Sequence, residues 1–288
     1  HSALESVLNQ SFKDWECIIV NDGSPDETEA VAQEWCSLDS RFRYVKQANS
    51  GLASARNLGI SEAKGLYFQF LDADDVLESD KFQYHRNHID GTIDVSIAGY
   101  RYFEDGDSQS RQRIIGPNDI TPEVVVTKND CLDLPLLLAR RNIFVVCSPV
   151  YKADLVRSLG GFEESLLALE DWYLNLRLAL SGARFDHFGY PAMSRALVRL
   201  HPTSMSQDSE QIQENYRVFQ DLCSSLPEYK SCASIQAKLG ERKAQNHSPT
   251  HSSNFSRAKA LIRYCSPPVV IDIAEMLVGP IHSILTAK

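Results

Sequence analysis

A cluster of aspartates follows an apolar segment of the chain. Asp72, Asp74 and Asp75 come directly after Leu66 to Leu71, which is apolar at most positions. If that segment is a buried strand, side chains two residues apart share a face, so Asp72 and Asp74 converge on one point. Their charges repel unless a cation, a proton or a hydrogen bond offsets them, and carboxylate oxygens suit Mg²⁺ or Mn²⁺. The run predicts a divalent cation site that would in turn attract a phosphate. An acidic loop in which Asp75 caps the next helix is the alternative.

The chain around these aspartates alternates between extended and helical patterns. Short apolar runs bounded by turn residues predict strands, and apolar residues at helical spacing predict helices. The expected strands are 17 to 20, 43 to 45, 66 to 71, 94 to 100 and 196 to 200. The expected helices are 2 to 10, 30 to 38, 52 to 64, 132 to 138 and 171 to 180. This alternation predicts an α/β fold with a mostly parallel sheet covered by helices.

Composition excludes several classes of protein. The 288 residues can bury one large α/β core or two modest ones. With 29 basic and 38 acidic residues the formal charge is -9, which disfavours broad binding to nucleic acid. The 7 cysteines are scattered without a Cys-x-x-Cys pair, which predicts reduced thiols in a cytosol. No uninterrupted apolar run approaches the roughly 20 residues that span a bilayer, so we expect a cytoplasmic protein.

Three parts of the chain differ in pattern. Residues 1–103 hold the regular alternation, and a polar stretch from Glu104 to Asn118 suggests a boundary. Residues 104–206 are mixed, and residues 207–288 are mainly helical in pattern. Within this last part, Pro267 to Leu285 combines apolar residues with charges and a proline. We expect an amphipathic helix that docks on the domain there, and a membrane-surface anchor is the alternative.

Several motifs occur together in an order that resembles the family 2 glycosyltransferases. They are Val20-Asn21-Asp22-Gly23-Ser24, Asn49-Ser50-Gly51-Leu52-Ala53-Ser54-Ala55-Arg56-Asn57-Leu58-Gly59, Leu71-Asp72-Ala73-Asp74-Asp75, Gly160-Gly161-Phe162, Glu170-Asp171-Trp172 and Arg199-Leu200-His201-Pro202-Thr203-Ser204-Met205-Ser206. The resemblance covers roughly residues 1 to 206. It implies a GT-A fold in which residues 1–103 bind a nucleotide-sugar and residues 104–206 bind the acceptor and carry the catalytic base.

The resemblance assigns the donor and a metal to residues of the first half. Asp22 matches a carboxylate that accepts the imide N–H of a base, which suits uracil and a UDP-linked donor; helix capping is the alternative. Asp74 matches a direct ligand of Mn²⁺ or Mg²⁺, and Asp72 matches a residue that binds ribose, metal or both. Arg56 matches an arginine that binds the base or a phosphate, or organises the site. The cation would neutralise the charge that grows on the departing diphosphate.

The later motifs match residues near the diphosphate and the acceptor. His201 matches a histidine beside the metal or the diphosphate, and Arg199 a phosphate contact; surface or packing roles are the alternatives. Asp171 matches the general base that removes the proton of the acceptor hydroxyl, with Glu170 in support, whereas both would stabilise a helix start in the other interpretation. Displacement by a single oxygen inverts the anomeric centre. Trp172 would face an acceptor sugar or pack in the core.

We therefore expect a metal-dependent inverting glycosyltransferase. It would move a sugar from a nucleotide-sugar to a hydroxyl of a glycan or lipid-linked acceptor, in polysaccharide biosynthesis at the cell envelope and with peripheral contact at the inner face of the membrane. Family members place an apolar strand ahead of the helix at residues 2 to 10, and here the first strand is missing. A sheet without it exposes hydrogen-bonding groups. This keeps open a catalytically impaired nucleotide- or glycan-binding module, and less favourably a nucleotidyltransferase.

Overall fold

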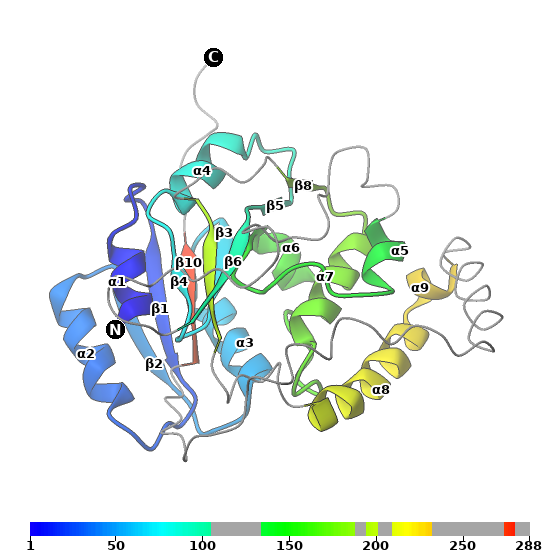
Figure 1. The fold of residues 1–288 in the computed structure, drawn as a ribbon, viewed down its shortest axis with the longest axis horizontal. Helices are drawn as coiled ribbons and strands as arrows, with labels where there is room; N and C mark the ends of the chain where they lie inside the picture. The colour runs from blue at the N-terminus through cyan, green and yellow to red at the C-terminus, as the bar shows by residue number, and fades with distance from the viewer. Residues whose placement is uncertain (105–133, 188–193, 201–208, 232–273, 280–288) are drawn as a thin grey trace.

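The computed structural model describes residues 1–104, 134–187, 194–200, 209–231 and 274–279. These ranges form a seven-stranded sheet, a three-stranded sheet and helices packed around them (Figure 1). The helices are α1 (Ser2–Leu8), α2 (Thr28–Leu38), α3 (Leu52–Glu62), α4 (Lys81–His88), α5 (Leu134–Leu138), α6 (Ala153–Ser158), α7 (Glu170–Leu180), α8 (Ser209–Ser225) and α9 (Pro227–Ser231). The strands are β1 (Glu16–Asn21), β2 (Phe42–Lys46), β3 (Tyr67–Leu71), β4 (Val76–Leu77), β5 (Val95–Ile97), β6 (Tyr100–Glu104), β7 (Pro149–Lys152), β8 (Phe185–His187), β9 (Ala196–Leu200) and β10 (Ala274–Gly279).

The larger sheet has the strand order β2-β1-β10-β3-β7-β5-β8. Strands β2, β1, β3, β5 and β8 share one direction, while β10 and β7 run against their neighbours. Ile18, Ile19 and Val20 at its centre are fully buried, as expected for an apolar, β-branched strand covered on both faces. The predicted α/β class is confirmed, and the predicted strands at 17 to 20, 43 to 45 and 66 to 71 match β1, β2 and β3 closely. The sheet is mixed rather than mostly parallel, because β10 and β7 make antiparallel ladders with both of their neighbours.

The strand β10 corrects one prediction from the sequence. Residues 274 to 279 fall within the predicted amphipathic helix, but they form an extended strand that pairs antiparallel with both β1 and β3. Met276 is opposite Ile19 on one side and Leu71 on the other. Short apolar runs do not distinguish a strand from a buried helix, and ladder pairing on both sides decides the matter here. Strand β10 therefore lies between β1 and β3 in the larger sheet.

A second correction concerns the segment from Asp94 to Tyr100, predicted as one strand. It contains β5, which ends at Ile97 in the larger sheet, and the start of β6 in the smaller one. The smaller sheet has the order β4-β9-β6, with β9 antiparallel to β4 and parallel to β6. Strand β4 follows the acidic turn after β3, so this sheet brings Arg199 of β9 beside the aspartates.

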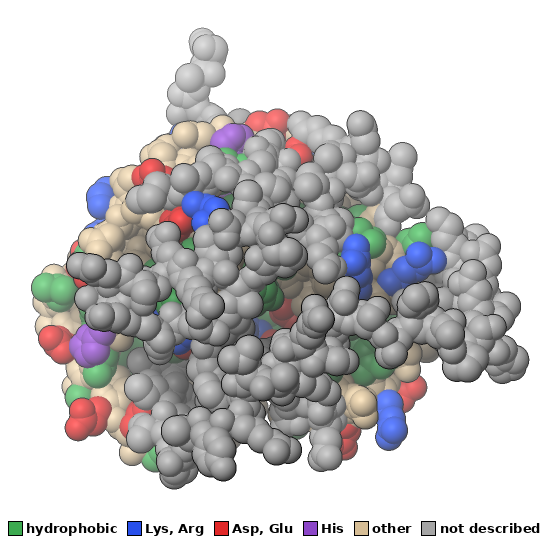
Figure 2. Space-filling model, in the orientation of Figure 1, with side chains coloured by type: hydrophobic (Ala, Val, Ile, Leu, Met, Phe, Trp, Pro, Cys, Tyr) green, Lys and Arg blue, Asp and Glu red, His purple; other side chains and the backbone are tan. Residues whose placement is uncertain are grey.

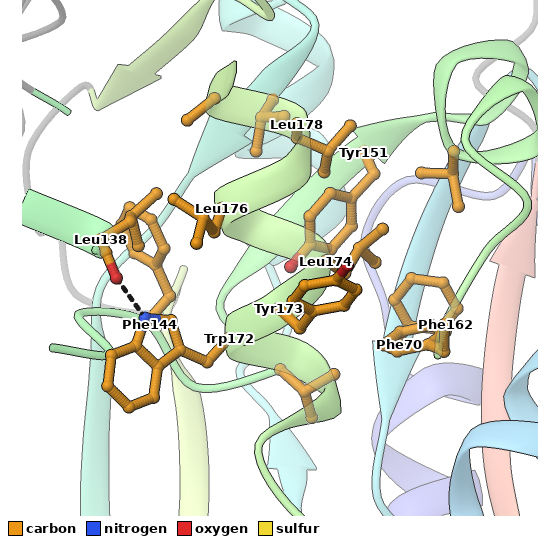
Figure 3. Close-up of a cluster of buried hydrophobic side chains, with 14 of the residues drawn as sticks. Phe70, Leu138, Phe144, Tyr151, Phe162, Trp172, Tyr173, Leu174, Leu176 and Leu178 are labelled. Carbon is orange, nitrogen blue, oxygen red and sulfur yellow. Dashed lines mark hydrogen bonds between the residues drawn. The ribbon is translucent and has the colours of Figure 1, made fainter. Parts of the chain in front are cut away.

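Helix α7 is buried on nearly every side. Its aromatic and leucine side chains pack among residues of the larger sheet and of α5, as Figure 3 shows. The indole Nε1 of Trp172 donates a hydrogen bond to the backbone oxygen of Leu138, and the same ring lies 4.4 Å from that of Phe219 in α8. A helix held by such close packing has little freedom to shift, so its first turn keeps a fixed place.

The described side chains that are visible on one face of the molecule include both signs of charge. Figure 2 shows acidic and basic side chains interspersed on the visible face, with small separate hydrophobic areas. Among the described residues, no helix combines the length and the hydrophobicity that crossing a membrane would require. The cysteines of these ranges, Cys17, Cys36, Cys147 and Cys223, carry free thiols, as their scattered spacing predicts.

Candidate active site

The candidate site lies where β1 and β3 end. Asp22 follows directly after β1, and Asp72 follows directly after β3. Ligands of open α/β sheets bind beyond the carboxyl ends of the strands, because loops and helix N-termini converge there. The structure therefore brings the two predicted donor-binding aspartates to one edge of the sheet.

Asp22 is buried and holds the loop that leads into α3. One carboxylate oxygen accepts hydrogen bonds from the side-chain amide of Gln47 at 2.7 Å and from the backbone N–H of Ser50 at 2.8 Å. The other accepts the N–H of Gly51 at 2.8 Å. Gly23 permits this arrangement, since its φ is +76° and a Cβ there would lie 2.7 Å from the backbone nitrogen of Asn49. Asp22 thus organises the loop before α3 rather than the start of α2.

The acidic turn separates its aspartates into two environments. Asp72 and Asp74 are partly exposed, whereas Asp75 is 4% exposed and faces inward. The Asp75 carboxylate accepts the backbone N–H of Arg199 at 2.9 Å and the thiol of Cys147 at 3.3 Å. The Arg199 side chain donates from Nε to the backbone oxygen of Asp74 at 2.7 Å. Burial, followed by the charges of Asp72 and Asp74, raises the pKa of Asp75.

The carboxylate oxygens of the acidic turn are of the chemical type that a divalent cation binds. In the ranges that the structure describes, no group of three or more histidine, cysteine, aspartate or glutamate side chains is arranged as a metal site. A Mg²⁺ or Mn²⁺ ion that binds substrate phosphates needs only one or two protein carboxylates, with phosphate oxygens and waters as its other ligands. Asp74 and Asp72 supply hard oxygens of that type, so the residues fit such an ion. His201, the third predicted ligand, lies outside the described residues.

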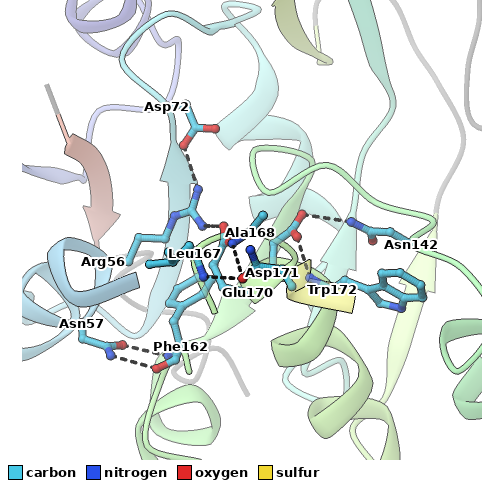
Figure 4. A network of polar contacts seen from close by, with 11 residues as sticks. Arg56, Asn57, Asp72, Asn142, Phe162, Leu167, Ala168, Glu170, Asp171 and Trp172 are labelled. Carbon is cyan, nitrogen blue, oxygen red and sulfur yellow. Dashed lines mark hydrogen bonds and ion pairs between the residues drawn. The ribbon is translucent and has the colours of Figure 1, made fainter. Parts of the chain in front are cut away.

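Arg56 joins two carboxylates inside the site, as Figure 4 shows. Its side chain is 1% exposed. Nη2 donates to Asp72 at 3.0 Å, and Nη1 donates to Glu170, which is also buried. The guanidinium carbon lies 5.0 Å from the ring centroid of Phe162, close enough for a cation–π contact. Although a third of its side chain is exposed, loss of solvation raises the pKa of Asp72, and the charge of Arg56 opposes that rise.

Asn57 fixes the backbone of the glycine-containing turn at residues 160 to 162. Its side-chain amide donates to the backbone oxygen of Phe162 at 2.9 Å and accepts the N–H of the same residue at 2.8 Å (Figure 4). A Cβ on Gly161 would lie 2.3 Å from the Asn57 side-chain oxygen, and the φ of Gly161 is +74°. Only glycine fits such a place without displacement, so the two motifs are complementary in shape.

Asp171 lies in the first turn of α7. Leu169, directly before the helix, has a φ of +70°, the left-handed region that leucine seldom adopts, and this turns the chain sharply into Glu170. Asn142 donates to one Asp171 oxygen at 3.1 Å, and the N–H of Trp172 donates to the other at 2.6 Å. Burial, then the neighbouring charge of Glu170, raises the pKa of Asp171 to about 7. A carboxyl that titrates near neutrality can accept a proton at physiological pH.

Trp172 has a packing role, and three residues that the sequence does not single out contact the aspartates of the site. Trp172 is buried against α5 and α8, so it packs in the core, which is the second of its two predicted roles. Asn142 and Cys147 contact Asp171 and Asp75, and no motif or spacing in the sequence points to either. The sequence likewise gives no signal for Gln47, which lies two residues before the motif that begins at Asn49 and donates to Asp22.

Comparison with known proteins identifies the family. The family model described as "Glycosyl transferase family 2" matches residues 1–144, which is half of the chain. The chain belongs to this family. It is 33% identical over 175 residues to the uncharacterized glycosyltransferase EpsJ of Bacillus subtilis and 30% identical over 181 residues to the glycosyltransferase GlyA of Streptococcus pneumoniae. These matches cover 60% and 62% of this chain, but only 50% of EpsJ and 25% of GlyA.

Solved structures support the GT-A fold of this family 2 chain. The S. aureus TarS 1-349 structure superimposes with a TM-score of 0.57 at 18% identity, covering 78% of this chain and 61% of that one. The mannosyltransferase PcManGT from Pyrobaculum calidifontis, in complex with GDP-Man and Mn²⁺, gives a TM-score of 0.53 at 15% identity, covering 82% and 64%. TarS 1-349 is also known in complex with UDP.

Proposed function

We propose that this chain transfers a sugar from a nucleotide-sugar, UDP-linked in our interpretation, to a hydroxyl group with inversion. The observation that carries the proposal is the position of Arg56. One guanidinium contacts both Asp72 of the acidic turn and Glu170, the residue before Asp171. The carboxylates proposed for donor binding and for base catalysis therefore belong to one site, as transfer between two bound molecules requires.

Asp171 is the general base in this proposal. It would take the proton from the acceptor hydroxyl as that oxygen attacks the anomeric carbon. The raised pKa of Asp171, about 7, makes it a stronger proton acceptor than an ordinary aspartate while leaving much of it ionised near neutral pH. A single displacement by this oxygen inverts the anomeric centre.

The donor would occupy the edge of the sheet between Asp22 and the acidic turn. Asp22 would accept the N–H of the uracil base, and Arg199 would contact the diphosphate. Asp74 and Asp72, with His201, would hold a Mn²⁺ or Mg²⁺ ion, whose contribution when bound is to neutralise charge on the leaving diphosphate. The UDP bound to TarS and the GDP-Man and Mn²⁺ bound to PcManGT support this choice of ligands.

The acceptor side is proposed from the family and its relatives. A hydroxyl of a glycan or a lipid-linked glycan is the class of acceptor that a family 2 glycosyltransferase implies, with assembly of a cell-envelope polysaccharide as the setting. The chain would work in the cytoplasm, at the inner face of the membrane where a lipid-linked acceptor is presented. The charge of -9 supports the absence of nucleic acid among its partners.

A screen of nucleotide-sugars tests the proposal. Each donor is incubated with the chain, Mn²⁺ or Mg²⁺ and a panel of glycan acceptors, and free nucleoside diphosphate is measured. We expect Asp74→Ala to weaken metal-dependent donor binding, and Asp171→Asn to keep binding but lose transfer. Transfer by Asp171→Asn at the parent rate would refute the assignment of the base. Binding of donor without turnover by the parent chain would favour the alternative, a nucleotide-binding module without catalysis.

A further inference from the structure

Arg56 is buried too deeply to be only a surface contact for a ligand. Its side chain is 1% exposed, and its partner Glu170 is 4% exposed. A buried carboxylate such as Glu170 needs a compensating charge, and Arg56 provides it. Through its other terminal nitrogen the same cation reaches Asp72, 3.0 Å away on the other half of the site.

The surroundings of Arg56 hold its guanidinium in one orientation. The Phe162 ring lies under it, with 5.0 Å between the guanidinium carbon and the ring centroid. Asn57, the next residue of α3, fixes the backbone of Phe162 through its two amide hydrogen bonds. Phe70 in β3 packs edge-on against Phe162 with 4.8 Å between ring centroids. The arginine is thus braced from the helix, the sheet and the turn at once.

We propose that Arg56 is a positioning residue that links Asp72, on the donor side, to Glu170 and hence to the adjacent Asp171. The inference rests on the proposed function. A planar fork of donors can bridge two carboxylates in a fixed geometry, and a lysine ammonium cannot reproduce that geometry. The separation between the bound donor and the base would therefore depend on Arg56.

The charges of Glu170 and Arg56 also affect the pKa of Asp171. Glu170 raises the pKa of Asp171, and Arg56 lowers it. Replacement of Glu170 by glutamine removes the like charge while keeping an oxygen that can accept from Arg56. The pKa of Asp171 should then fall, so the acidic limb of the rate profile should move to lower pH. A purely structural role of Glu170 would leave that limb in place.

The test compares Arg56→Lys, Glu170→Gln and the double variant in the 288-residue chain. We expect Arg56→Lys to lower kcat at saturating donor between about 10-fold and about 100-fold, because misplacement of a bound donor against its base costs about that much. The double variant should lose no more than the worse single variant, since both substitutions weaken the same ion pair between Arg56 and Glu170. An unchanged kcat with a raised KM for the donor would show direct donor contact and overturn the proposal.

Arg43→Lys is the matched control. Arg43 also joins two carboxylates, Glu16 at 3.2 Å and Glu62 at 3.0 Å, but it belongs to β2, its partner Glu62 is the last residue of α3, and its side chain is 34% exposed. We expect this variant to keep the parent kcat. A fall in kcat equal to that of Arg56→Lys would mean that any loss of a bridging arginine loosens the enzyme, and it would overturn the specific role of Arg56.

A measurement without substrate separates this inference from the proposed function. The melting temperatures of the parent, both single variants and the double variant form a cycle that reports the coupling of Arg56 to Glu170. We expect the double variant to lose less than the sum of the single losses, and additive losses would refute the link. If no nucleotide-sugar is consumed by the parent chain, the proposed function fails even where the cycle shows coupling.

Discussion

The titration of Asp171 gives a direct test of the catalytic assignment. Burial and the charge of Glu170 raise the pKa of this carboxyl from 3.8 to about 7. A base must be ionised to accept a proton, so donor consumption should fall about tenfold for each pH unit below that value. The rate at pH 5 would then be about one hundredth of its plateau. An aspartate of ordinary pKa would be about nine-tenths ionised at pH 5 and would give a nearly flat profile.

The assay is the release of nucleoside diphosphate at saturating donor and Mn²⁺, measured from pH 5 to pH 9. Saturating donor matters because the pKa of Asp72 is also raised, and its protonation would weaken donor binding rather than turnover. The limb expected from Asp171 appears in kcat, whereas one from Asp72 appears mainly in the KM for the donor. A kcat that stays constant between pH 5 and pH 8 would refute the assignment of Asp171 as the base.

Two further predictions concern stability. Asp171→Asn should stabilise the fold at pH 8 and not at pH 4. Because the folded pKa of Asp171 is raised from 3.8 to about 7, its carboxyl destabilises the fold progressively as the pH rises from 3.8 to about 7, and by at most about 4 kcal/mol above that range. The substitution removes this cost and loses about 1 kcal/mol with one hydrogen bond. Urea unfolding at both pH values measures this, and equal effects at pH 4 and pH 8 would contradict it. Gly161→Ala should destabilise by more than about 2 kcal/mol, since its φ of +74° and the Asn57 oxygen 2.3 Å from the new Cβ both oppose it. Gly160→Ala shares the positive φ of +80° but meets nothing within 4 Å, so a loss as large as that of Gly161→Ala would rule out the Asn57 contact as the cause.

Local sequence patterns were sufficient to predict the strand that ends at the site and the helix that begins there. The run from Cys17 to Val20 is apolar and ends in turn residues, and β1 covers it. The spacing from Asp171 to Leu180 predicts a helix that the structure begins at Glu170. The prediction of one strand from Asp94 to Tyr100 was wrong, because a continuous extended pattern does not reveal that the chain passes from one sheet to another. The prediction for β10 was wrong because both partner strands lie more than 200 residues away in the sequence, beyond any local pattern.

The sequence predicts which residues form the candidate site, but it does not predict the contacts that hold them. Asp22, Asp72 and Asp171 could be named from their motifs, yet each is held by groups that the sequence alone does not connect to them. Asn142 contacts Asp171, and Cys147 contacts Asp75, across 29 and 72 positions of the chain. Neither an asparagine nor a single cysteine carries a pattern that predicts such a contact, since the fold alone brings them into reach.

The motifs of this chain pair with one another in space, and this explains why they occur together. Arg56 of the second motif binds Glu170 of the fifth, and Asn57 beside it binds the backbone of Phe162 in the fourth. Asp75 of the third motif accepts the N–H of Arg199 in the sixth. The second and third motifs thus meet late ones across the boundary between the proposed donor and acceptor halves, whereas Asp22 of the first motif binds the second. A substitution in one member of such a pair therefore disturbs the partner, so the donor side and the base are expected to respond together.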